Sequence, residues 1–249
     1  MKLRHLAAGL LVGALALTAC GKEGSPGATS SGPTQTAAAG VTVEGSSTFA
    51  AIQQRGRVVM GVRADQPGLG FQDATTGQYS GFDIEIARLV AAKLGYGPDK
   101  LDYKVVPSAA REDTIERGEI DYMVGTYTIN DNRKQRVSFA GPYYVAGQSL
   151  LVRADDTAIT SKDTLKGKKV CSVTGSTPIQ RVKDQQLTEP ENIVEFQTYS
   201  QCVDQLLNNQ VDVVTTDDAI LKGFAAQQPD KLKVVGATFS TEPYGIGLN

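Results

Sequence analysis

Short apolar segments of strand length alternate with amphipathic segments of helix length from about residue 57 onward, and this rhythm constrains the fold more than any other feature. A first set predicts strands at 58–62, 101–106 and 120–125, and helices at 83–94, 110–117 and from 130. A second set predicts strands at 168–173, 192–197, 211–216 and 232–235, and helices at 177–187, 200–208 and 218–227. Strands that alternate with helices form mostly parallel sheets covered on both faces, so the sequence predicts an α/β protein.

A faint internal repeat relates the two sets. Residues 117–126 and 208–217 both contain a helix end, a polar turn, an apolar residue followed by Asp, and a strand. Any two strand–helix units could share this pattern by chance. Because ligands of open α/β sheets bind beyond the carboxyl ends of strands, two such units that face each other predict a cleft between two lobes.

Composition excludes several classes of function. The 249 residues include 25 Lys and Arg against 27 Asp and Glu, and this balance disfavours nucleic-acid binding. The one histidine, His5, lies in a segment that we expect to be cleaved off, so the mature chain cannot use a Ser-His-Asp or Cys-His mechanism. It also lacks the commonest zinc ligand, and no phosphate-binding Gly-x-x-x-x-Gly-Lys loop occurs. We expect no metal, no cofactor and no ATP hydrolysis by this chain.

The N-terminus has the pattern of an export signal. Two cations, an apolar run at 6–17 and small residues before Cys20 predict a signal peptide at 1–19. The segment Leu17-Thr-Ala-Cys-Gly21 resembles the lipobox of bacterial lipoproteins, which implies a lipid on Cys20 and a membrane anchor; an ordinary signal peptide is the alternative. Residues 20–50, rich in Gly, Ser, Thr and Ala, predict a flexible linker. We therefore expect an exported protein held at the outer face of the cytoplasmic membrane.

Two cysteines remain after Cys20, and an even number in an exported protein favours a disulfide. Cys171 lies in a predicted strand and Cys202 at the start of a predicted helix. A bridge between them would close a loop of about 30 residues and stabilise the fold by about 3 kcal/mol in the chain-entropy model. Two buried free thiols are the alternative.

Four sequence blocks resemble the signatures of family 3 extracellular solute-binding proteins, which serve ABC importers of polar amino acids. They are Gly81–Ala87, Gly125–Lys134, Val137–Tyr144 and Val211–Asp218. Two further segments, Asp65–Leu69 and Val170–Pro178, look most like the glutamate-binding lipoproteins of Gram-positive bacteria. The resemblance implies a two-lobed periplasmic-binding-protein-like fold of type II, with two hinge strands and a ligand cleft between the lobes.

The same resemblance implies where the lobes begin and end. We expect lobe one at 51–146, lobe two at 147–241 and a return hinge strand at 242–249. The outgoing crossing is placed near Pro142–Leu151 and the return near Pro243–Leu248. Because the family normally continues with further helices, the rest of lobe one is expected to be missing.

The resemblance also assigns residues to a free amino acid, whose two charges need opposite charges to be buried. Arg133 matches the position that clamps the α-carboxylate, and Asp217 matches the one that receives the α-ammonium. Three hydroxyl residues complete this set: Thr126, Thr128 and Ser176. Thr177, predicted as the N-cap of a helix with Pro178 at its first position, reaches the carboxylate from lobe two. A solvated arginine and a plain helix cap are the alternatives.

Selectivity for the ligand side chain requires a second positive site. Arg111 resembles an arginine of glutamate and aspartate binders, and Arg63 and Ser108 are further candidates; each could instead be an ordinary surface group. Asp65 complicates this assignment, because it would repel a distal carboxylate unless Arg63 or Arg111 neutralises it. The resemblance thus favours glutamate or aspartate, with glutamine or another polar amino acid as the alternative.

The expected function is capture of the amino acid by a monomer that closes around it and docks on a membrane permease. An enzyme of the dehydratase kind on the same fold is one alternative, with Glu112 and Asp113 beside Arg111 as its candidate acids. A sensor domain that feeds a receptor is another.

Overall fold

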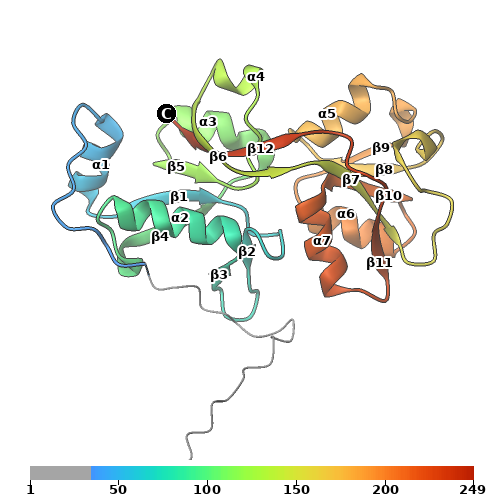
Figure 1. Cartoon of the computed structure of the whole chain (residues 1–249), viewed down its shortest axis with the longest axis horizontal. Coiled ribbons are helices and arrows are strands. Elements are labelled where there is room, and N and C mark those ends of the chain that lie inside the picture. Colours follow the sequence, from blue (N-terminus) through green and yellow to red (C-terminus); the bar gives the residue numbers. More distant parts are fainter. Residues whose placement is uncertain (1–34) are drawn as a thin grey trace, which may run out of the picture. The chain divides into compact units, whose positions relative to one another are not determined.

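A computed structural model describes residues 35–249, which form two α/β lobes (Figure 1). The predicted signal peptide at 1–19, the predicted lipidation site Cys20 and the start of the predicted linker lie outside the described residues. The predicted α/β architecture with two lobes is confirmed.

Lobe one is built on a five-stranded sheet with the strand order β4-β1-β5-β12-β6. Its strands are β1 (Val58–Val62), β4 (Leu101–Val105), β5 (Tyr122–Val124), β6 (Ser138–Ala146) and β12 (Glu242–Leu248). Its helices are α1 (Ser47–Arg55), α2 (Phe82–Lys93), α3 (Arg111–Glu116) and α4 (Asp131–Lys134). A small antiparallel hairpin pairs β2 (Phe71–Gln72) with β3 (Tyr79–Ser80), and 3-10 turns occupy Pro98–Lys100 and Ser108–Ala110.

Lobe two is built on a second five-stranded sheet with the order β11-β7-β10-β8-β9. Its strands are β7 (Gln148–Arg153), β8 (Val170–Val173), β9 (Ile193–Phe196), β10 (Val213–Asp217) and β11 (Leu232–Val235). Its helices are α5 (Thr177–Asp184), α6 (Tyr199–Leu207) and α7 (Asp218–Gln227), with 3-10 turns at Lys162–Thr164 and Pro190–Asn192. Among the helices between residues 35 and 249, none is both long enough and apolar enough to cross a membrane.

Both sheets are mostly parallel, as expected, with one reversed strand in each. In lobe one, β1 is parallel to β4 and β5, but β12 is antiparallel to β5 and β6. In lobe two, β8 is parallel to β9 and β10, but β7 is antiparallel to β10 and β11. The reversed strands β7 and β12 are those by which the chain enters each lobe from the other. No helical crossover precedes them, so nothing forces them to run parallel to their neighbours.

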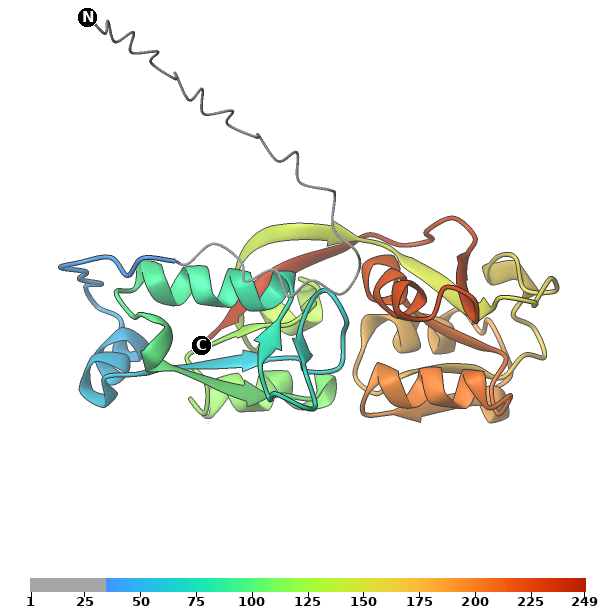
Figure 2. The same ribbon diagram turned by 90° about the horizontal axis from the view of Figure 1, so that it is seen from below.

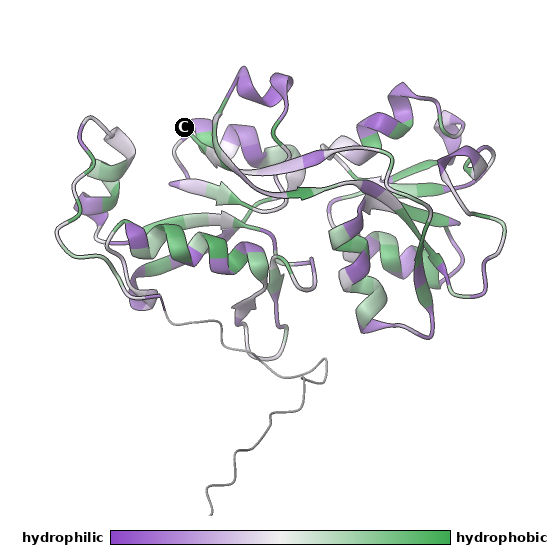
Figure 3. Cartoon of the chain, in the orientation of Figure 1, coloured by the Kyte–Doolittle hydropathy of each residue, from purple (hydrophilic) through white to green (hydrophobic). Residues whose placement is uncertain are grey.

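Each sheet buries both of its faces. In lobe one, Val124 joins the apolar cluster under α1 and α2, whereas its neighbour Met123 joins the cluster under α3. In lobe two, Val214 joins the cluster under α6 and α7, and Val213 joins the cluster under α5. Successive side chains of a strand point to opposite faces, so the two neighbouring positions of each central strand are both apolar. Figure 2 shows α2 and α3 on opposite faces of the first sheet, and Figure 3 shows apolar strands beside helices with one polar face.

The internal repeat of the sequence is also a repeat of the structure. Its strands, β5 and β10, are each the middle strand of a sheet. The preceding helices end alike, because Gly118 and Asn209 both adopt left-handed backbone conformations, with φ of 64° and 57°. Their amides bond to Ile115 O at 2.9 Å and Leu206 O at 3.2 Å. The repeat therefore places the residues after two central strands in equivalent positions.

Two connections join the lobes, and they are bonded to each other. The outgoing chain passes from β6 into β7 through Gly147, and the return runs through residues 236–241 into β12 (Figure 1). Gln148 N donates to Ser240 Oγ at 2.9 Å, and Phe239 N donates to Gln148 O at 2.9 Å. The segment predicted for the outgoing crossing, Pro142–Leu151, covers the end of β6 and the start of β7, and the segment predicted for the return, Pro243–Leu248, lies in β12.

Regular structure begins before residue 51, within the stretch predicted as linker. Ser46 caps α1, its Oγ accepting a hydrogen bond from Phe49 N at 3.1 Å. Phe49 and Ile52 are buried, at 5% and 2% exposure. These two apolar residues are spaced to lie on one face of the helix, and through them α1 packs against lobe one.

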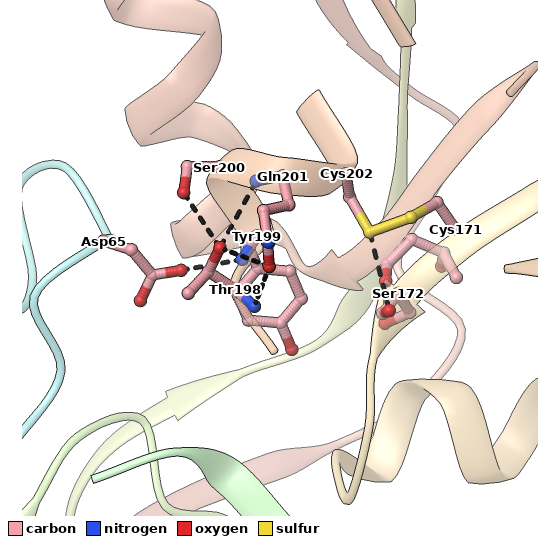
Figure 4. The surroundings of a disulfide bond; sticks show 9 residues. Asp65, Cys171, Ser172, Thr198, Tyr199, Ser200, Gln201 and Cys202 are labelled. Carbon is pink, nitrogen blue, oxygen red and sulfur yellow. Dashed lines mark hydrogen bonds between the residues drawn. A yellow bond between two sulfur atoms is a disulfide. The ribbon is translucent and has the colours of Figure 1, made fainter. Parts of the chain in front are cut away.

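The predicted bridge between Cys171 of β8 and Cys202 of α6 is present as a disulfide, with a Cα–Cα distance of 5.6 Å. Both residues are completely buried in the cluster under α6 and α7. The bond ties the first turns of α6 to a strand of the second sheet (Figure 4).

Candidate ligand-binding site

The residues at the carboxyl ends of the two central strands define the candidate site. Thr126 follows β5 and adopts φ of 44°, a conformation that is uncommon for a residue with a side chain. Its amide donates to Asp83 Oδ2 at 2.8 Å, and its hydroxyl lies 3.1 Å from Gln66 Nε2. Both partners are fully buried. The surrounding chain thus holds Thr126 in a fixed, strained position beyond the strand end.

Asp217 is the last residue of β10, at the equivalent place in lobe two, and it is 3% exposed. Its Oδ2 accepts a hydrogen bond of 2.7 Å from the hydroxyl of Tyr244, whereas its buried Oδ1 has no hydrogen-bond partner among the described residues. Burial, together with the charge of Glu242, raises the pKa of Asp217 from 3.8 to about 7. A buried carboxylate oxygen without a donor is costly, and this oxygen is left unsatisfied by the described residues.

Arg133 lies on α4 in lobe one and is 8% exposed. Its guanidinium donates to Thr128 O at 2.6 Å and to Gly175 O of lobe two at 3.3 Å. It also lies 3.3 Å from a carboxylate oxygen of Glu112 and 4.9 Å from the centre of the Tyr127 ring. The side chain predicted to clamp a carboxylate is therefore buried between the lobes, which disfavours the alternative of a solvated surface arginine.

Arg111, the first residue of α3, is 2% exposed and lies 4.3 Å from the centre of the same Tyr127 ring. Its hydrogen-bond acceptors are backbone carbonyls, Ser108 O at 3.2 Å and Gly125 O at 3.3 Å. No carboxylate of residues 35–249 forms an ion pair with it. Burial first, and then the charge of Arg133, lowers its pKa to about 9, so it stays charged at neutral pH. Within residues 35–249 its buried charge therefore has no carboxylate at ion-pair distance, although the charge of Glu112 acts on it from farther away.

Arg63 is equally buried but is neutralised within the chain. Its Nη2 lies 2.8 Å from Asp65 Oδ1, and its Nη1 donates to Val106 O at 3.2 Å. The remaining contact goes to Gln197 O of lobe two at 3.3 Å. Of the two arginines weighed for the ligand side chain, Arg111 is thus the one without a carboxylate partner in the described chain.

Lobe two presents the start of α5 to the same region. Ser176, and not Thr177, is the N-cap, because its Oγ accepts from Ile179 N at 3.3 Å while Thr177 is already helical. This corrects the predicted cap by one residue. The Thr177 hydroxyl donates to Glu242 Oε2 at 2.9 Å and lies 3.5 Å from Thr128 Oγ1 of lobe one. Ser176 therefore caps its helix, and Thr177 spans the lobes.

The lobes are in direct contact around these residues. A Cβ on Gly175 would lie 2.6 Å from Ala109 Cα, so the two backbones touch across the lobes. Leu69 of lobe one joins the apolar cluster of lobe two that contains Phe224. An open groove of about 450 Å³ remains beside the site, lined mainly by α4 and α5. The structure therefore has the lobes closed on each other.

Several contributors were missed by sequence reasoning. They are Gln66, Asp83, Glu112 as a partner of Arg133, Tyr127, Glu242 and Tyr244. Asp83 was read only as the start of a helix, yet burial raises its pKa to about 6 although the Thr126 amide and the Tyr143 hydroxyl both bond to it. Asp218, the first residue of α7, accepts a hydrogen bond from Gly147 N at 3.2 Å at the hinge. Nothing in the local sequence distinguishes these roles from ordinary core or surface positions.

Comparison with known proteins identifies the family. Residues 58–209 match the bacterial extracellular solute-binding proteins, family 3. The glutamine-binding protein of Geobacillus stearothermophilus is 38% identical over 95% of this chain and 88% of its own length. The glutamate-binding protein GluB of Corynebacterium efficiens is 40% identical over 82% of this chain and 72% of its own length. The chain therefore belongs to family 3 of the bacterial extracellular solute-binding proteins, and the predicted resemblance is confirmed.

Solved structures agree with this assignment. An ancestral arginine-binding protein bound to arginine superposes with a TM-score of 0.71 and 36% identity, over 78% of this chain and 85% of its own. The predicted periplasmic-binding-protein-like fold is thereby confirmed. These similar proteins are named for glutamine, glutamate and arginine, so family membership by itself does not select a ligand.

Proposed function

We propose that this protein captures an acidic amino acid, glutamate or aspartate, and delivers it to the permease of an ABC importer. The family and the names of its relatives support amino-acid binding for transport. The observation that carries the acidic preference is Arg111, a buried guanidinium with carbonyl acceptors only. The ligand is bound without chemical change.

The proposed contacts start from two groups without an ionic partner among the described residues, and from one arginine that already contacts the chain. Oδ1 of Asp217 lacks a donor and would receive the α-ammonium. The fork of Arg133 suits the α-carboxylate, because a guanidinium meets a carboxylate with two parallel bonds. Arg111 then takes the carboxylate of the side chain. The remaining contacts would come from hydroxyl or carbonyl groups of Thr126, Thr128, Thr177, Ser176 and Ser108.

Asp65 does not oppose a distal carboxylate in this arrangement. One of its oxygens pairs with Arg63 at 2.8 Å, and the other accepts the Tyr199 amide at 2.7 Å. With both oxygens occupied by donors of the chain, Asp65 carries little free charge toward a ligand. Its partner Arg63, predicted as a ligand cation, then serves to neutralise Asp65 instead.

A second candidate, glutamine binding, is favoured by one observation. Arg111 and Arg133 both lie within 5 Å of the Tyr127 ring centre, at 4.3 and 4.9 Å. One α-carboxylate between the two guanidinium groups would satisfy both of them. The ligand side chain would then need no charge of its own.

Calorimetric titration with glutamate, aspartate, glutamine and arginine separates the two candidates. If Arg111 binds a distal carboxylate, glutamate exceeds glutamine in affinity by about tenfold to a hundredfold, because the neutral amide leaves the buried cation unpaired. Arg111→Gln then removes most of that preference. Arg88→Gln is the matched control, since Arg88 also lies over a tyrosine ring, at 5.7 Å from Tyr103, but pairs with Glu85 on α2. Tighter binding of glutamine overturns the acidic assignment, and binding of no amino acid overturns the function.

A further inference from the structure

The loop after β1 reaches across the cleft to the start of α6. Asp65 Oδ2 accepts a hydrogen bond of 2.7 Å from Tyr199 N, the first residue of α6 (Figure 4). Beside it, Arg63 Nη2 donates to Gln197 O at 3.3 Å. One ion pair of lobe one therefore contacts both a donor and an acceptor of the same loop in lobe two.

Both sides of this contact are held rigidly. Arg63 grips Asp65 Oδ1 through two nitrogens, at 2.8 and 3.2 Å, and is itself bonded to Val106 O. Asp65 also pairs with Phe71 in an isolated bridge. The carboxylate is thus aimed before the lobes meet, and little side-chain freedom remains to be lost on closure.

The receiving end is equally fixed. Thr198 caps α6, its hydroxyl and the Gln201 side chain forming a capping box. Cys202, in the first turn, is bridged to Cys171 of β8, so that α6 cannot swing away from its sheet (Figure 4). The Tyr199 amide belongs to the first turn, where amides have no acceptor within the helix, and the positive end of the helix dipole favours a carboxylate.

We infer that the Arg63–Asp65 pair is a closing latch, which stabilises the closed lobes through the start of α6 without touching the amino acid. Given the proposed function, the pair acts on affinity for every ligand alike, and it leaves selectivity to the other side chains of the cleft.

Asp65→Asn is the direct test. An amide has one acceptor oxygen, so Asn cannot serve both Arg63 and Tyr199. Loss of a hydrogen bond to a charged group changes an equilibrium by about tenfold to a hundredfold. We therefore expect glutamate and glutamine to lose affinity by the same factor in this range. The Tyr199 amide of the saturated variant should exchange its hydrogen at least about tenfold faster than in the parent protein.

Asp102→Asn is the matched control, because Asp102 also pairs with an arginine, Arg57, at 2.7 and 2.9 Å, but within lobe one. It should alter neither readout. If Asp65→Asn fails to fold, the same measurements are made on Asp65→Glu. The longer side chain of Glu keeps the negative charge but moves the carboxylate away from the Tyr199 amide.

The inference is overturned if the variant changes the ratio of glutamate to glutamine affinity by more than about tenfold, since Asp65 would then contact the ligand side chain. It is overturned equally if Tyr199 exchange is unchanged. Failure of the proposed function is a separate outcome, in which the parent protein binds no amino acid. In that case the exchange of Tyr199 in the ligand-free parent and variant still tests the latch.

Discussion

Replacing Asp217 by Asn should stabilise the ligand-free protein and abolish binding at the same time. The carboxyl group is 3% exposed, one of its oxygens has no donor, and its pKa is raised from 3.8 to about 7. A raised pKa means that the folded state binds the proton more tightly than the unfolded state does. The associated stability is therefore present below about pH 4 and is lost as the pH rises through about 7.

The size of the effect follows from the shift. Each pKa unit corresponds to about 1.4 kcal/mol, so a rise from 3.8 to about 7 makes the ionised carboxylate cost up to about 4 kcal/mol of unfolding free energy at pH 8. Asn has a similar shape, can accept the Tyr244 hydroxyl bond and cannot ionise. The variant should therefore gain up to about 4 kcal/mol at pH 8, and the gain should vanish near pH 4.

Urea denaturation of ligand-free protein across this pH range measures the difference. Asp218→Asn is the control with the opposite sign. Burial acts to raise the pKa of Asp218, but hydrogen bonds from Lys222 and Gly147 outweigh it, and the pKa is lowered. Losing that carboxylate should destabilise the protein at pH 8. If Asp217→Asn is destabilised at pH 8, or if its effect does not depend on pH, the reasoning about Asp217 is wrong.

Two further predictions concern closure and the disulfide. Gly175→Ala places a Cβ against Ala109, at a residue whose backbone φ of +77° suits glycine. The substitution should therefore weaken amino-acid binding by at least about tenfold in calorimetric titration. Unchanged affinity would show that closure does not bring these two backbones together. The double substitution of Cys171 and Cys202 by Ala opens a loop with a sequence separation of 31 and should lower the unfolding free energy by about 3 to 4 kcal/mol in urea denaturation, whereas a loss below about 1 kcal/mol would contradict the chain-entropy estimate.

The local sequence was enough to predict the bounds of those elements whose structure does not depend on distant residues. The strands at 58–62 and 232–235 and the helix at 218–227 have the predicted bounds. Their signals are continuous apolar runs and a regular helical face, which need no information from distant residues. The directions of β7 and β12 were missed because strand direction depends on the path of the whole chain between lobes.

The pairings among the candidate site residues could not be predicted from the sequence. Arg63 and Asp65 stand two residues apart, yet the sequence could not show that they pair with each other and with lobe two. Tyr127 reads as an apolar residue at a strand end, although two guanidinium groups lie over its ring. Glu242 accepts a hydrogen bond from the hydroxyl of Thr177, which lies more than sixty residues away in the sequence. Such contacts are set by closure of the lobes, which no local pattern reports.

The central claim is that Arg133 and Asp217 hold the α-carboxylate and the α-ammonium of one amino acid between the lobes. Calorimetric titration with glutamate, glutarate and γ-aminobutyrate tests it most directly, because glutarate lacks the ammonium and γ-aminobutyrate lacks the α-carboxylate. We predict that glutamate binds and that each analogue loses at least about a hundredfold in affinity, since a buried charge is left without its partner. Binding of glutarate or γ-aminobutyrate as tightly as glutamate would contradict the account.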